Sequence, residues 1–220
     1  MSTSHNFKDP ARLRDCLRLY LVTDRASMGS RTLIDVVQAA VHGGVTCVQL
    51  REKQANARDF HAMAAALTAL LAPQCIALII NDRVDIALAC GAHGVHLGQS
   101  DLPVASARKL LPPEVFIGWS VETAADVALA SQLPVDYLGV SPVFATPTKT
   151  DTHAPWGLNG LRDVRKQTPL PLVAIGGIHA GNAREVLAAG ADSLAVVSAI
   201  CSATDPKAAA TTLRSLCDAR

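Results

Sequence analysis

The chain has 220 residues, half of them hydrophobic, and its formal net charge at pH 7 is +1. Such a chain can bury a large core, and without a basic run it is a poor candidate for binding nucleic acid or an anionic membrane. Two tryptophans, two tyrosines and four phenylalanines also offer few platforms for base stacking.

The N-terminal segment is polar and contains no apolar signal core, so we expect no secretion signal and a cytoplasmic protein. The most apolar region, residues 64–80, is interrupted by Pro73 and Gln74 and is too short to span a bilayer of about 30 Å. The six cysteines are scattered and form no Cys-x-x-Cys pair. This usage fits a reducing compartment rather than a disulfide framework.

Short apolar runs alternate along the chain with segments of helical periodicity. The runs predict eight strands, at residues 19–22, 46–50, 77–80, 94–97, 115–119, 136–140, 172–175 and 193–197. The intervening segments predict helices at residues 32–42, 60–71, 84–90, 104–111, 122–131, 158–166, 182–190 and 205–217. Thr32 is expected to cap the first of these helices and Asn182 the seventh.

Eight strands, each followed by a helix, predict an α/β protein with the (β/α)₈ TIM-barrel fold. The strands are almost wholly apolar, as expected when both faces of a parallel sheet are buried. We expect one domain over residues 1–220, with residues 1–17 as an extension outside the barrel core. A doubly wound open sheet is the alternative, but it usually has fewer strands, and no G-x-G-x-x-G turn follows the first strand.

Active sites of such barrels lie at the carboxyl ends of the strands, so the residues that end each apolar run are candidates for function. The sequence places polar residues or glycines after seven of the strands. They are Gln49, Arg51, Glu52 and Lys53; Asn81 and Asp82; Gln99, Ser100 and Asp101; Ser120; Thr146, Thr148 and Lys149; Gly176 and Gly177; and Val197 with Ser198. We expect all of them on one rim.

The chemistry of these residues indicates two phosphorylated groups. Asp82 and Asp101 follow neighbouring strands and suit Mg²⁺, which prefers oxygen ligands. Arg51, Lys53 and Lys149 are cations that could bind a diphosphate. The turns after the last two strands are the usual phosphate site of this fold, where backbone N–H groups hold the anion.

Each signal also has a structural interpretation. Asp82 and Asp101 could be plain helix caps, residues 51–53 a solvated charge run, and the glycine pair a tight turn. The polar run after the sixth strand could be a disordered loop. His93 and His96 stand three residues apart in a strand and point to opposite faces, so structural roles are favoured over a metal pair.

Several stretches together resemble the thiamine-phosphate synthase family, in its order and spacing. They are QLREK (49–53), IINDRVDIALACGAHGVHLGQSD (79–101), IGWS (117–120), SPVFATPTKT (141–150), AIGGI (174–178) and AVVSAI (195–200). Ser141 departs from the glycine usual in the family, and His93 from the usual aspartate. The resemblance implies a (β/α)₈ barrel that uses Mg²⁺ to join a hydroxymethylpyrimidine diphosphate to a thiazole phosphate or its carboxylated form. The products would be thiamine monophosphate and pyrophosphate.

The resemblance also implies roles for individual residues. Arg51, Lys53, Ser120 and Lys149 would be catalytic. The pyrimidine diphosphate would be bound by Gln49, Leu50, Arg51, Glu52, Lys53, Asn81, Ser120 and Lys149. The thiazole phosphate would be bound by Thr146, Pro147, Thr148, Gly177, Val197 and Ser198. Asp82 and Asp101 would hold Mg²⁺.

Three other functions remain as alternatives. A thiazole tautomerase-like relative would need no metal, and a non-catalytic regulator would bind phosphate without releasing pyrophosphate. Another phosphosugar barrel enzyme would leave the two carboxylates and the threonine–lysine run unexplained. The expected partners are small phosphorylated molecules, and a homo-oligomer is compatible with the sequence.

Overall fold

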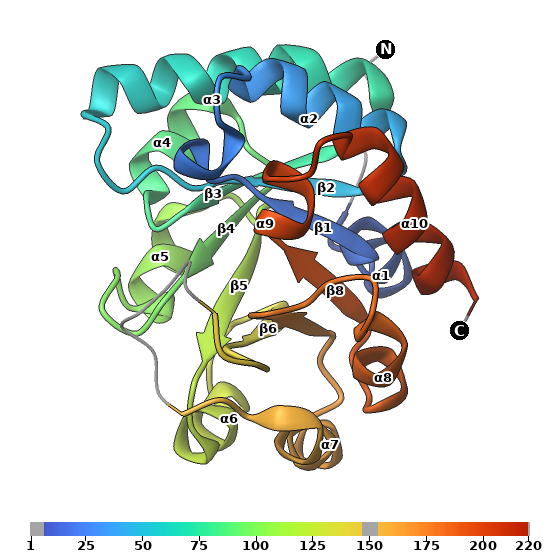
Figure 1. The fold of residues 1–220 in the computed structure, drawn as a ribbon. Coiled ribbons are helices and arrows are strands. Elements are labelled where there is room, and N and C mark those ends of the chain that lie inside the picture. Colours follow the sequence, from blue (N-terminus) through green and yellow to red (C-terminus); the bar gives the residue numbers. More distant parts are fainter. Residues whose placement is uncertain (1–6, 147–153, 220) are drawn as a thin grey trace.

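The structure, a computed structural model, describes residues 7–146 and 154–219 and is a closed ring of parallel strands surrounded by helices (Figure 1). The strands pair in the order β1 to β8, and β1 pairs with β8, which closes the barrel. This closure confirms the predicted TIM barrel and excludes the open doubly wound sheet. The strands are β1 (Leu19–Val22), β2 (Cys47–Leu50), β3 (Ala77–Asn81), β4 (Gly94–Leu97), β5 (Phe116–Val121), β6 (Tyr137–Val140), β7 (Leu172–Ile175) and β8 (Ser193–Val196).

Helices follow the strands and cover the outside of the ring. They are α2 (Leu33–His42), α3 (Ala57–Leu71), α4 (Val84–Cys90), α5 (Val104–Leu110), α6 (Ala124–Ala130), α7 (Gly157–Gln167), α8 (Ala183–Ala188), α9 (Ser198–Cys201) and α10 (Pro206–Asp218). Short 3₁₀ turns at Arg25–Met28 and Ala72–Gln74 and the helices α1 (Pro10–Leu17) and α9 were not predicted. Within the described ranges, no helix is both long and apolar enough to cross a membrane.

Two helix starts test the predicted caps. The Thr32 hydroxyl accepts a hydrogen bond from the backbone N–H of Asp35, as expected of a capping residue. Asn182 holds the predicted N-cap position of α8, but the predicted capping by its side chain is wrong, since that side chain makes no capping bond to the helix. Instead it accepts from the His179 N–H and donates to the Gly177 carbonyl, so it braces the turn before the helix.

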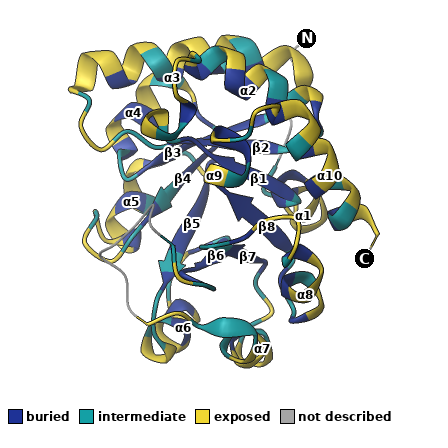
Figure 2. Ribbon diagram, in the orientation of Figure 1, coloured by how far each residue is buried: buried dark blue, intermediate teal, exposed yellow. Residues whose placement is uncertain are grey.

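The strands are buried along most of their length (Figure 2), and their alternating side chains build two apolar layers. Outward side chains such as Leu21, Val48 and Leu78 pack against the helices, in a cluster that runs around the barrel. Inward side chains such as Tyr20, Ile79 and Phe116 form a separate cluster inside the ring. Because successive strand residues face opposite sides, every strand except β4 contributes to both layers, which explains the nearly continuous apolar sequences of the strands.

Large and small residues alternate around the barrel interior. Tyr20, Phe116 and Tyr137 are fully buried there. A Cβ atom at Gly118 would overlap the Tyr137 ring, and one at Gly94 would overlap the Phe116 ring. The glycines therefore make room on one strand for an aromatic ring from the next strand.

The helix α1 closes the amino-terminal end of the barrel. Leu13, Cys16 and Leu17 are buried and belong to the inner cluster. The expectation that residues 1–17 lie outside the barrel core is therefore wrong for this helix. Apolar residues spaced one helical turn apart give α1 a buried face, and Asp9 caps its first turn.

We predict that Gly118→Ala lowers the free energy of unfolding by about 1–3 kcal/mol, because the added methyl group overpacks against Tyr137. In a Tyr137→Leu background the same change should cost less, since the ring that it strikes is gone. A double-mutant cycle by urea unfolding measures this coupling. Strictly additive costs would contradict the interpretation.

We also predict that Leu17→Ala costs about 2–5 kcal/mol of stability, as truncation of a buried leucine does. The matched control is Leu110→Ala, also at the last residue of a helix but 59% exposed, which should stay within about 0.5 kcal/mol of the wild type. Both are measured by urea unfolding. Equal losses of stability in the two variants would show that α1 is only loosely packed against the barrel.

Candidate active site

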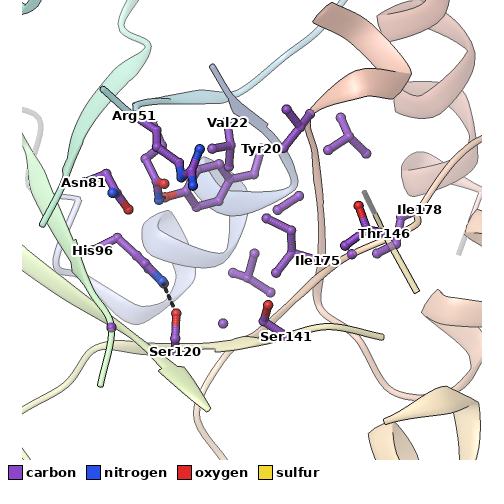
Figure 3. Close-up of a pocket in the computed structure, with 18 of the residues that line it drawn as sticks. Tyr20, Val22, Arg51, Asn81, His96, Ser120, Ser141, Thr146, Ile175 and Ile178 are labelled. Carbon is purple, nitrogen blue, oxygen red and sulfur yellow. Dashed lines mark hydrogen bonds between the residues drawn. The ribbon is translucent and has the colours of Figure 1, made fainter. Parts of the chain in front are cut away.

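A pocket of about 440 Å³ lies within the barrel at the carboxyl ends of the strands (Figure 3). Its volume is in the range of small-molecule sites. Eleven of the residues with implied roles line it, and they come from seven strands or the turns after them. They are Gln49, Arg51, Lys53, Asn81, Asp82, Asp101, Ser120, Thr146, Gly177, Val197 and Ser198.

Two of the implied residues are placed elsewhere. Leu50 is fully buried in the outer layer, because in β2 it faces away from the inward Gln49. The Glu52 carboxylate pairs with the Arg25 guanidinium at 2.8 Å and does not line the pocket. Neither residue therefore lines the pocket, and their contact with the substrate stays a prediction from the resemblance. Pro147, Thr148 and Lys149 lie outside the described residues.

The two carboxylates that end β3 and β4 lie together on one side of the pocket. The Lys53 Nζ atom is 3.5 Å from Asp82 Oδ2, and the Asp101 carboxylate accepts from the Gly98 N–H at 2.6 Å. Burial, and after it the neighbouring Asp101, raises the pKa of Asp82, Lys53 opposes both, and the resulting pKa is about 6. A carboxyl with a pKa that high carries an electrostatic cost when ionised, which a bound cation would relieve.

The alternative interpretation as helix caps is not supported for either aspartate. Residues 83 and 103 hold the N-cap positions of α4 and α5, and neither helix start has a side-chain capping bond. Asp82 instead has φ +63°, a left-handed conformation that is uncommon outside glycine. Its N–H donates to the His96 carbonyl, so the backbone turns the carboxylate toward Asp101.

Two carboxylates fit a magnesium ion better than a zinc ion. Mg²⁺ is commonly held by one or two carboxylates, with water and substrate phosphates as the other ligands. Among the described residues no cluster of three or more His, Cys, Asp or Glu side chains could hold a metal. The donor set at Asp82 and Asp101 is thus suited to a metal that arrives with a phosphorylated substrate.

The turn after β7 packs closely against the segment that follows β6. The Val143 N–H donates to the Ile175 carbonyl and the Phe144 N–H to the Gly176 carbonyl. A Cβ atom at Gly176 would come within 2.7 Å of Pro142, and one at Gly177 within 2.8 Å of Phe144. Both glycines also have positive φ. The tight-turn interpretation is therefore correct for them, and their packing holds the segment that leads to Thr146.

The positions of the side chains divide the pocket into two parts. Figure 3 shows Arg51, Asn81 and His96 on one side and Thr146 with Ile178 on the other. Arg51 and the two aspartates bring charge to the first part. The second part is formed by the turns after β7 and β8 and is mostly backbone and apolar side chains.

The sequence interpretation missed several residues that line the pocket, among them Tyr20, His96 and Glu122. The sequence favours a structural role for His96, but its ring lines the pocket and bonds to Ser120 Oγ at 2.9 Å. His93 faces away and its ring lies against Phe7, at 5.0 Å between ring centroids. The two-residue period could have identified His96, because Val95 and Leu97 on either side of it face the helices.

Residues 19–200 match the family model of thiamine monophosphate synthase. A thiamine-phosphate synthase of Albidiferax ferrireducens is 74% identical over 203 residues, which cover 92% of this chain and 93% of the relative. A thiamine-phosphate synthase of Leptospira biflexa is 52% identical over 200 residues, covering 89% of this chain and 95% of the relative.

The fold agrees with these sequence matches. The solved structure of a thiamine phosphate pyrophosphorylase from Pyrococcus furiosus superposes with a TM-score of 0.86 at 37% identity, and the match covers 94% of this chain and 98% of the other. The family model, the relatives and the fold all lead to the same conclusion. The chain belongs to the thiamine-phosphate synthase family.

Proposed function

We propose that the pocket joins a hydroxymethylpyrimidine diphosphate to the ring nitrogen of a thiazole phosphate and releases pyrophosphate. As a member of the family, the chain is a transferase. The observation that carries the proposal is that two carboxylates, two cations and a phosphate-type backbone site line one and the same pocket. A diphosphate with its metal and a monophosphate would then be bound side by side.

The charged side of the pocket suits the pyrimidine diphosphate. Arg51 and Lys53 both line it, and Arg51 offers a planar fork of donors that suits phosphate oxygens. Asp82 and Asp101 would hold Mg²⁺ against the same diphosphate. Gln49 and Asn81 add buried amides beneath, which could hydrogen-bond the heterocycle. Lys149 keeps its proposed role at the leaving group from the family resemblance alone.

The second side suits the thiazole phosphate. Gly177, Val197 and Ser198 end β7 and β8, where barrels of this fold commonly bind phosphate through backbone N–H groups. The Thr146 hydroxyl lies at the same side and could add a further contact. Ile175 and Ile178 supply apolar surface for the ring. Pro147 and Thr148 remain assigned to this substrate by resemblance.

Catalysis on this arrangement is chiefly electrostatic. Arg51 and Lys53 stabilise the negative charge that grows on the departing pyrophosphate, and bound Mg²⁺ would supply further positive charge at the same place. The electron-rich aminopyrimidine can carry positive charge at its exocyclic methylene, which the thiazole nitrogen then attacks. Holding both substrates in one pocket contributes proximity.

The alternative functions would leave some of the charged pocket residues without a role. A thiazole tautomerase has no diphosphate to hold and would not need the carboxylate pair with Lys53. A regulator that only binds phosphate would not need to place two phosphate sites so close together. The charged side of the pocket therefore favours the synthase reaction.

The direct test is pyrophosphate release by the purified protein, given both substrates and Mg²⁺, with thiamine phosphate followed in parallel as its fluorescent oxidation product. We expect release that needs both substrates and stops when a chelator is added. Thiazole tautomerisation or phosphate binding without pyrophosphate release would refute the proposal.

We predict that Asp82→Asn lowers turnover by roughly 10²–10³-fold, as loss of one charge-stabilising group often does.

In the wild type the Mg²⁺ concentration for half-maximal rate should rise as the pH falls below about 6, because the Asp82 carboxyl with its raised pKa is protonated there and protons compete with the metal. Steady-state rates across Mg²⁺ concentrations at several pH values measure both effects.

The matched control is Asp85→Asn, which removes an exposed carboxylate from the same loop–helix segment and should leave turnover and the Mg²⁺ requirement unchanged. An Asp82→Asn variant with the wild-type Mg²⁺ requirement would remove this residue from the metal site.

A further inference from the structure

Beneath the pocket a chain of side-chain hydrogen bonds crosses the barrel interior. Gln49 Nε2 donates to the Tyr20 hydroxyl at 2.7 Å, and that hydroxyl lies 3.0 Å from the Tyr137 hydroxyl. His96 Nδ1 is 2.9 Å from the Tyr137 hydroxyl, and His96 Nε2 is 2.9 Å from Ser120 Oγ. The five residues come from β2, β1, β6, β4 and β5 in that order, so the chain ties five of the eight strands together.

One consistent set of donor and acceptor roles along these hydrogen bonds starts from the Gln49 amide. An amide N–H can only donate, so the Tyr20 oxygen accepts from Gln49, and in this set the Tyr20 hydroxyl donates to the Tyr137 hydroxyl. The Tyr137 oxygen accepts that hydrogen and directs its own to His96 Nδ1. The Nδ1 atom must then be without a proton, and the proton of a neutral ring sits on Nε2. A protonated imidazolium would place two hydrogens between His96 and Tyr137.

Ser120 stands at the pocket end of this chain. With Nε2–H as donor, the Ser120 oxygen accepts from His96 and its own hydrogen can point into the pocket. The opposite direction would make Ser120 a donor to His96 and turn its lone pairs toward the substrate. In the set of roles that starts from Gln49, Ser120 presents its hydrogen to the pocket.

The side chains that form these hydrogen bonds are shielded from solvent, and the two tyrosines among them stay protonated. Gln49, Tyr20 and Tyr137 are 4%, 1% and 0% exposed. Burial raises the pKa of both tyrosines, so both keep the hydrogen that the chain needs at ordinary pH. Phe116 packs beside Tyr137 and shows that this part of the core accepts a ring without a hydroxyl. Because a phenylalanine ring also packs well in this part of the core, packing alone does not explain why Tyr20 and Tyr137 bring two hydroxyl groups into contact there.

We propose that the Gln49–Tyr20–Tyr137–His96 chain is a positioning relay that holds His96 in the Nε2–H tautomer and makes Ser120 a hydrogen-bond donor to the substrate. The proposal rests on the proposed function in one respect, since the acceptor would be an oxygen or ring nitrogen of the pyrimidine diphosphate. Tyr137 and Tyr20 act through His96 and Ser120 and are positioning residues.

The first test reads the tautomer without any activity. Long-range ¹H–¹⁵N correlation spectra of the ¹⁵N-histidine-labelled protein show which ring nitrogen carries the proton, and the loss of one signal set in His96→Gln identifies this residue among the seven histidines. We expect the Nε2–H tautomer. An Nδ1–H tautomer or an imidazolium at neutral pH would overturn the proposal, whatever reaction the protein catalyses.

The second test breaks the relay with Tyr137→Phe, which keeps the ring and removes the link between Tyr20 and His96. We expect His96 to populate both tautomers and kcat to fall by about tenfold or more, with little change in the KM for the thiazole phosphate. The matched control is Ile79→Val, a loss of one methyl group in the same inner cluster, which should change neither the tautomer nor kcat. A Tyr137→Phe variant with the wild-type tautomer and kcat would refute the relay.

Discussion

The interior of a closed eight-stranded barrel is the constraint on which the rest of this structure depends. Every strand sends alternate side chains into the same confined space, so the rings of Phe116 and Tyr137 require glycines on the neighbouring strands. The lower interior is filled by these rings and closed by α1. At the upper end the inward residues become polar, and the pocket begins there.

The aromatic filling and the catalytic rim are therefore parts of one arrangement. The tyrosines that pack the core also carry hydroxyl groups, and these lie directly under His96 and Ser120. A buried hydroxyl is costly without a partner, so the tyrosines, the histidine and the amide satisfy one another across strands that are distant in the sequence. The hydrogen bonds among the core tyrosines therefore continue without a break to His96 and Ser120, which line the pocket.

Much of this could be predicted from the sequence because it depends on short-range pattern. Apolar runs and helical periods gave the strand and helix positions, and the rule that sites lie at the carboxyl ends of strands placed Asp82, Asp101 and Ser120 on one rim. The resemblance covers the whole QLREK stretch, but it could not indicate that the Leu50 side chain packs in the outer layer or that Glu52 pairs with Arg25. Asn182 resembled a cap, but its amide bonds to the preceding turn. The hydrogen-bond relay involves residues up to 117 positions apart, and no local pattern records such a contact.

The closure of the barrel by α1 has a consequence for the movement of ligands. With aromatic rings filling the interior and a helix sealed across its amino-terminal end, small molecules reach the pocket from the carboxyl side. Two substrates and two products must share that mouth. Whichever ligand sits nearer the opening then controls the exit of the one below it, so binding order and product release become properties of the barrel's shape as well as of its chemistry.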